Sequence, residues 1–179
     1  GFNGHEIWEQ NRALCDAVIY ESFAFGFNGS FLPASIVNNH IEAVSRDQKP
    51  VWLADTAWPL SPDLDRVAEL TWAMSLMCDG PNRTARTPTA DNFFAPHKVT
   101  RLALGSPLAP PLQSQPWAGG CRWSRRFASG LALLNYEPTA WSVRADGTYW
   151  DYRGQRYTPA AKVELPAYSG KALITKWYT

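Results

Sequence analysis

The sequence predicts an α/β segment followed by an all-β domain. Over residues 1–80, helical periodicity alternates with short apolar strands. Residues 81–120 are rich in proline and show little periodicity, and we expect them to form an irregular connection. Over residues 121–179, short β-rich runs follow one another closely and are separated by turn signals. That pattern is typical of a small antiparallel β-sandwich.

The α/β segment begins with Asn3 followed by Glu6, a capping-box spacing that predicts a helix start. Its last helix is predicted to begin at Ser61, a capping residue, with Pro62 in the first turn. Apolar strands separated by helices imply parallel pairing and right-handed crossovers. In chain order we expect a helix over 3–14, a strand over 17–20, a helix starting near Ser35, a strand over 51–54, a helix from Ser61 and a strand over 74–78.

The β domain begins with a hairpin whose turn is signalled by Ala128, Ser129 and Gly130. Further Gly-containing turns punctuate the rest of the segment. The expected strands are 122–127, 131–135, 140–145, 148–152, 156–158, 161–165 and 171–177.

Composition excludes several classes of protein. The chain has 179 residues, of which 45% are hydrophobic and 18% charged, so it has enough apolar material for a core and does not resemble a disordered chain. Its net charge of +1 argues against a surface built for nucleic acid or an anionic membrane. The longest nearly unbroken apolar stretch, Leu70 to Cys78, is about half as long as a membrane-spanning helix. We therefore expect neither nucleic acid nor membrane as a partner.

The cysteines Cys15, Cys78 and Cys121 match no zinc or redox spacing. We expect buried, idle thiols, although one disulfide with a free thiol remains an alternative. No metal motif and no cofactor motif is visible, which leaves only a carboxylate-bound Ca²⁺ open. The chain shows no signal-like segment, so the compartment stays undetermined and secretion is one option.

Carboxylates follow or end each expected parallel strand: Glu21, Asp55 and Asp79. In parallel α/β architectures, ligands bind at the carboxyl ends of the strands. Neighbouring strands lie about 4.8 Å apart, so two such acids can approach the separation of roughly 5 to 9 Å used in glycoside hydrolysis. We therefore interpret Glu21 and Asp55 as a catalytic pair.

Cleavage of an acetal needs a proton donor for the leaving oxygen and a second carboxylate that acts as nucleophile or as base for water. Nearby aromatic groups would favour the protonated form of the acid. The candidate substrate-binding residues are Tyr20, Phe23, Trp58 and Asp79. The structural alternative is that these strand-end acids cap the next turn or helix, above all in the turn-like Asp79-Gly80-Pro81, and that Trp58 merely packs on a helix.

Nine tryptophans favour a carbohydrate-binding surface, because indole faces stack on sugar rings, but they equally fit an aromatic core. The alternatives to a hydrolase are therefore a non-catalytic carbohydrate-binding module that uses exposed tryptophans, and an inactive fragment. The expected partner is an oligosaccharide or polysaccharide, whose sugar and linkage the sequence leaves open.

Several segments resemble TIM-barrel glycoside hydrolases that carry a small trailing β domain. Arg126–Asn135 (RFASGLALLN) resembles the strand pair that follows the barrel, and Val163–Gly170 (VELPAYSG) resembles the closing strand of that β domain. Leu104–Pro107 (LGSP) resembles the segment that precedes it. Asp16–Phe23 (DAVIYESF) and Lys49–Asp55 (KPVWLAD) are similar to late barrel strands.

The resemblance implies the C-terminal half of such a hydrolase, with a partial (β/α)8-type parallel barrel segment ahead of the β-sandwich. Glu21 and Asp55 are the positions that would inherit the catalytic roles. A full barrel needs about 250 residues, so the first barrel strands are missing from these 179 residues. The outer expected strands would then have open edges. We therefore expect a homo-oligomer, or a partner that supplies the missing N-terminal half.

Overall fold

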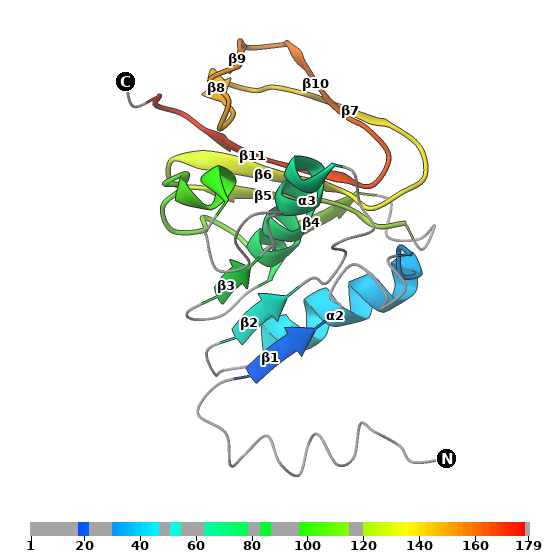
Figure 1. The fold of residues 1–179 in the computed structure, drawn as a ribbon. Helices are drawn as coiled ribbons and strands as arrows, with labels where there is room; N and C mark the ends of the chain where they lie inside the picture. Colours follow the sequence, from blue (N-terminus) through cyan, green and yellow to red (C-terminus); the bar gives the residue numbers. More distant parts are fainter. Residues whose placement is uncertain are drawn as a thin grey trace, which may run out of the picture.

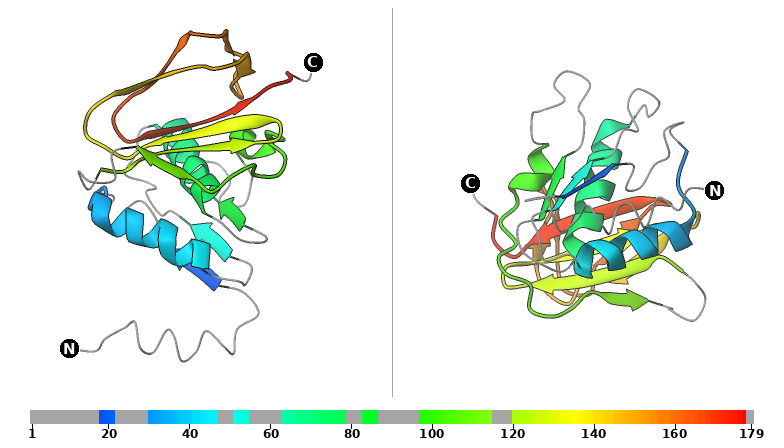
Figure 2. Two further views of the ribbon diagram at one scale, coloured as in Figure 1. Left: turned by 180° about the vertical axis from the view of Figure 1, so that it is seen from behind. Right: turned by 90° about the horizontal axis from the view of Figure 1, so that it is seen from below.

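Three sheets and two α-helices form the described part of the chain, which comprises residues 18–21, 30–46, 51–54, 63–78, 83–86, 97–114 and 120–177 of a computed structural model (Figure 1). A three-stranded sheet lies on one side of the helices and a six-stranded sheet lies on the other. A two-stranded sheet lies outside the six-stranded one (Figure 2). Helix α3 (Leu64–Met77) is therefore enclosed between β3 (Arg83–Arg86) and the six-stranded sheet, whereas α2 (Ala34–Arg46) keeps an exposed face.

The three-stranded sheet is parallel and follows chain order: β1 (Val18–Glu21), β2 (Val51–Ala54) and β3 (Arg83–Arg86). The first two strands were predicted, and their parallel pairing is present. The third was not: β3 falls in the segment that was expected to be irregular. That segment also contains the short 3-10 helix η1 (Lys98–Arg101) and the strand β4 (Leu112–Ser114).

The strand expected over residues 74–78 is wrong. Met74 to Met77 form the last turn of helix α3 (Leu64–Met77), and Cys78 is its C-cap. The helix begins at Leu64, later than the cap predicted at Ser61, and its N-cap is Asp63, which accepts a hydrogen bond from the Arg66 N–H at 3.0 Å. A short apolar run suits a buried helix as well as a strand. Here the second half of α3 packs between two sheets, so every residue from Leu70 to Cys78 is buried or half-buried, whichever side of the helix it occupies.

The fold class predicted from the sequence is consequently wrong. The described structure consists mostly of antiparallel sheets with two short helices, and it contains no parallel barrel. Its parallel strands form a short open sheet. The barrel prediction required a third strand at Met74–Cys78, but these residues end α3, and α3 packs against the antiparallel sheet. The helix expected near residues 3–14 lies outside the described residues.

The strands expected after Arg122 are all present, with shifts of a few residues at their ends. The hairpin of β5 (Arg122–Phe127) and β6 (Gly130–Asn135) turns at Ala128 and Ser129, as predicted. The six-stranded sheet has the order β4-β5-β6-β11-β8-β9. The remaining strands are β7 (Trp141–Arg144), β8 (Tyr149–Trp150), β9 (Arg156–Tyr157), β10 (Lys162–Leu165) and β11 (Ser169–Ile174).

Strand β6 is buried along its whole length because it separates two cores. Ala132 and Leu134 face the helices, whereas Leu131 and Leu133 face the two-stranded sheet formed by β7 and β10. Strand side chains alternate between faces, so a strand covered on both sides is apolar at every position. The central position of β6 thus explains its uninterrupted Gly-Leu-Ala-Leu-Leu sequence.

Helix α2 (Ala34–Arg46) was predicted from its apolar face and is attached to the six-stranded sheet by side-chain hydrogen bonds. Asn38 donates to the Gly120 carbonyl at 3.2 Å and accepts from the Trp123 indole N–H at 3.0 Å. The Tyr136 hydroxyl donates to the Leu32 carbonyl just ahead of the helix at 3.0 Å. These contacts join the beginning of the described chain to its β half.

Candidate functional site

The structure describes two of the predicted site residues, both in β1. Glu21 is the last residue of β1 and pairs with Ala54, the last residue of β2, while Tyr20 pairs with Leu53. Asp55 follows Ala54 directly in the sequence. Asp55 and the other candidates, Phe23, Trp58 and Asp79, lie outside the described residues.

The register places the carboxyl ends of all three parallel strands side by side. Ala54 pairs with Glu21 on one side and with Arg86 of β3 on the other. Neighbouring strands are about 4.8 Å apart. The sheet edge therefore brings one acidic position, Glu21, next to the strand that leads into a second, Asp55. Asp79 was a candidate because it was expected to follow a third parallel strand. The segment before it is a helix, so this argument no longer applies to Asp79.

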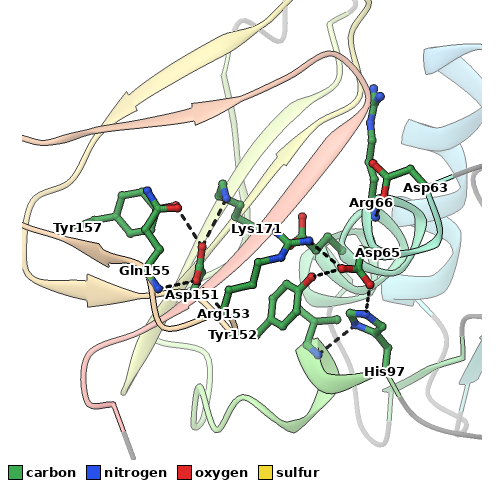
Figure 3. A network of polar contacts seen from close by, with 12 residues as sticks. Asp63, Asp65, Arg66, His97, Asp151, Tyr152, Arg153, Gln155, Tyr157 and Lys171 are labelled. Carbon is green, nitrogen blue, oxygen red and sulfur yellow. Dashed lines mark hydrogen bonds and ion pairs between the residues drawn. The ribbon is translucent and has the colours of Figure 1, made fainter.

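A second cluster of ionisable residues, which the sequence did not reveal, joins α3, η1 and the turn between β8 and β9 (Figure 3). It consists of Asp65, Glu69, His97, Tyr152 and Arg153, and we call it the Asp65 cluster. One Asp65 oxygen accepts from His97 Nε2 at 2.9 Å. The other accepts from the Tyr152 hydroxyl at 3.0 Å and from Arg153 at 3.1 Å. Arg153 also donates to Glu69 at 2.9 Å.

His97 uses both ring nitrogens within this cluster. Its Nδ1 accepts from the Val99 N–H at 3.2 Å, which caps η1, so in the neutral ring the hydrogen lies on Nε2 and is donated to Asp65. A histidine acting as base for a nucleophile needs one nitrogen directed at the reacting group. His97 therefore serves as a structural bridge and not as a catalytic base.

The two carboxylates of the cluster experience opposite electrostatic environments. The hydrogen bond from His97 is the main cause that lowers the pKa of Asp65 to about 2, assisted by Arg153 and Tyr152. Burial raises the pKa of Glu69, against the attraction of Arg153 and Lys171. Burial likewise raises the pKa of Tyr152, which stays a hydrogen-bond donor. Separated carboxyl pKa values are a feature of acid–base sites.

Geometry nevertheless favours a structural role for the Asp65 cluster. Both Asp65 oxygens accept hydrogen bonds from the protein, and Arg153 lies between the two carboxylates. The Arg153 guanidinium also stacks over the Tyr152 ring at 4.5 Å. A substrate would have to displace these partners to reach either acid. The cluster thus holds the β8–β9 turn against the beginning of α3.

Asp151 fixes the conformation of that turn from within. Its carboxylate is almost fully buried, and one oxygen accepts from the backbone N–H groups of Arg153 and Gln155, both at 3.0 Å. The other oxygen accepts from the Tyr157 hydroxyl at 3.2 Å and lies 3.8 Å from Lys171 Nζ. A buried carboxylate with this many donors has its hydrogen-bonding capacity satisfied and is held rigidly. Asp151 therefore positions Tyr152 and Arg153 for their contacts with α3.

Sequence reasoning missed the Asp65 cluster because its parts are far apart along the chain. The one local signal is the spacing of Asp65 and Glu69, which places two acids on the same face of a helix. That pattern also fits acids in the first turns of a solvent-exposed helix, where they are favourable. His97 and Arg153 carry no motif that would link them to those acids.

Among the described residues, no group of three or more His, Cys, Asp or Glu side chains could hold a metal ion. Neither described α-helix has the length and apolar character of a membrane span. Cys78 and Cys121 are buried and not joined in a disulfide, as expected for them, and Cys15 lies outside the described part. Comparison of the chain with protein-family models, with curated proteins and with solved structures gives no match.

Proposed function

We propose that the carboxyl ends of β1 and β2 form a site that cleaves glycosidic bonds, with Glu21 and Asp55 as its carboxylate pair. The observation that supports it is the parallel register in which Glu21 pairs with Ala54, the residue before Asp55. In this register the two acidic positions lie at the same edge of the sheet, on adjacent strands but one residue out of step. Because strand positions alternate between faces, the proposal requires the Asp55 side chain to turn towards the face of the Glu21 and Ala54 positions. The resemblance of the chain's segments to glycoside hydrolases supports the same chemistry.

In the proposed reaction, one carboxylic acid protonates the leaving glycosidic oxygen. The other carboxylate either attacks the anomeric carbon or removes a proton from the attacking water. The choice between these two routes depends on the distance between the carboxyl groups, which is about 5 Å for retention and longer for inversion. Tyr20, Phe23 and Trp58 supply aromatic surface for the sugar rings of an oligosaccharide or polysaccharide.

The proposal is tested with the full chain and its Glu21→Gln and Asp55→Asn variants. Each is assayed against a panel of aryl glycosides and soluble polysaccharides, with circular dichroism to verify folding. We expect each variant to lose at least about a hundredfold in turnover, because each removes a group that transfers a proton or forms a bond. Glu164→Gln, which removes an exposed carboxylate in β10, is the matched control and should keep full activity. A wild-type chain inactive on the whole panel, or variants that keep its activity, would overturn the proposal.

Association through the parallel sheet is part of the same proposal. In the order β1-β2-β3, no described strand pairs with the outer edge of β1 or of β3. Unpaired strand edges offer hydrogen-bonding groups to another chain. We expect a homo-oligomer by light scattering at micromolar concentration. A monomer that also binds no hydrophobic dye would contradict this part without affecting the catalytic test.

A further inference from the structure

The described part of the chain exposes a few large apolar side chains, and one of them is a tryptophan. This residue, Trp177, has 38% of its surface accessible. It follows the end of β11 and lies beside the turn between β8 and β9. Strands β8 and β9 and the end of β11 lie on the other side of α3 from β1 and β2 (Figures 1 and 2). Trp177 is thus remote from the proposed catalytic edge.

Gly154 provides the support on which the indole of Trp177 lies. A Cβ at Gly154 would be 3.2 Å from one ring atom of Trp177 and 3.6 Å from two others. Gly154 also has a φ of +82°, a conformation that side chains disfavour. The Gly154 N–H donates to the Asp151 carbonyl at 3.0 Å, within the turn that the buried Asp151 carboxylate holds. The ring therefore rests on a rigid surface that only glycine provides.

The exposed side chains near Trp177 along the chain and in this turn are polar. They are Arg153, Gln155, Arg156, Thr175 and Lys176. Interfaces with a protein partner bury a contiguous apolar centre. A single exposed aromatic ring with hydrogen-bond donors on adjoining residues instead suits a sugar, whose C–H face stacks on the ring while its hydroxyl groups bind the donors.

We propose that Trp177, seated on Gly154, binds a pyranose ring of a polysaccharide. The indole stacks on the sugar, and the exposed Gln155, Arg156 and Lys176, which adjoin Gly154 and Trp177 in the sequence, donate to its hydroxyl groups. A preformed aromatic surface of this kind binds without ordering a loop, which lowers the cost of association. This inference does not depend on catalysis by Glu21 and Asp55.

Affinity electrophoresis of the full chain tests the proposal, in native gels containing hydroxyethyl cellulose, xylan or laminarin. At least one polysaccharide should retard the wild-type chain. Trp177→Ala should bind it about tenfold more weakly, and Trp177→Phe should bind with intermediate strength because a smaller ring remains. Gly154→Ala keeps the tryptophan, but the added methyl group displaces the indole from its position against residue 154. This variant should therefore also bind more weakly.

Leu108→Ala is the matched control, because it removes an exposed apolar side chain elsewhere and should leave retardation unchanged. Absence of retardation in all three gels, or equal retardation of wild type and Trp177→Ala, would overturn the inference. Failure of the catalytic proposal looks different. Glu21→Gln should still be retarded, and Trp177→Ala should keep its turnover on aryl glycosides.

Discussion

A Cβ placed on Gly170 of β11 would lie 2.3 Å from the Cβ of Ala73 in α3. It would also lie 2.7 Å from the carbonyl oxygen of Glu69. Helix and strand backbones therefore meet here with no side chain between them. This contact joins the α/β segment of the chain to its β half in one core, which continues through Ala172 and Met74.

Gly170→Ala should destabilise the protein by about 2–3 kcal/mol, because the added methyl group forces the helix away from the sheet. The strand conformation of Gly170 is acceptable for alanine, so the cost is steric. Urea denaturation measures it. Gly147→Ala is the control, since its Cβ would make only an ordinary contact of 3.4 Å with Tyr149, and it should change stability by less than about 0.5 kcal/mol. Equal stabilities of the two variants would contradict the close approach.

Arg125→Met should destabilise the protein by roughly 3 kcal/mol. Arg125 is buried in β5, and its guanidinium donates to the carbonyls of Leu76 and Cys78 at the end of α3, at 3.1 and 2.9 Å. It also donates to the Ala109 carbonyl at 3.1 Å. Methionine fills the space but leaves these acceptors buried without a donor.

The neighbouring Arg126 provides the comparison for Arg125. Its side chain is 60% exposed and pairs with Asp146 at the surface. Arg126→Met should therefore cost no more than about 1 kcal/mol, as surface ion pairs do. Urea denaturation of both variants decides the matter, and an Arg125→Met loss as small as that of Arg126→Met would show that Arg125 is not needed at the helix end.

Asp65 should make part of the stability depend on acid pH. Its pKa is about 2 in the folded chain, below the ordinary 3.8, so the unfolded chain takes up the proton first as pH falls. The stabilisation is complete above about pH 4 and is lost as pH falls towards 2. Because the side chain is 54% exposed, solvent screening reduces the expected contribution to about 1 kcal/mol.

The measurement is the difference in unfolding free energy between wild type and Asp65→Asn at pH 5, 3 and 2. This difference should shrink on acidification, because asparagine has no charge to lose. Glu164→Gln controls for the loss of one exposed carboxylate. A difference that stays constant across this range would contradict the ionic role of Asp65.

Cys121 should be unreactive in the folded protein. Burial is the main cause that raises its thiol pKa to about 12, so very little thiolate forms at pH 8. Iodoacetamide at pH 8 should leave Cys121 and the buried Cys78 unmodified, and both should react in guanidinium chloride. Peptide mass spectrometry identifies the labelled residues. Rapid labelling of Cys121 under native conditions would contradict its burial.

The β half could be predicted in detail because its signals are local. Closely spaced β-rich runs, alternation in strands such as β10, and turn residues such as Ser129 and Gly130 indicate the strands without knowledge of their neighbours. The misassigned run Met74–Met77 shows the opposite case. An apolar run covered on several sides lacks a clear period, so its secondary structure follows from what surrounds it.

The two candidate sites differ in the same way. Glu21 and Asp55 could be proposed from sequence because each follows a strand signal, and parallel register then brings the strand ends together. The Asp65 cluster could not, since Asp65 is separated from His97 by 32 positions and from Tyr152 by 87. No periodicity connects residues over such distances.

The sequence alone determined most of the elements, the ends of β1 and β2 and the antiparallel character of the second half, because these depend on residue patterns a few positions long. Only the tertiary structure decided the fold class. The fold class depends on where α3 packs. Because Gly170 has no side chain, that helix can lie directly on β11. Tertiary contacts also decided which ionisable residues meet and where a tryptophan stays exposed, because packing brings together residues that are distant in the chain.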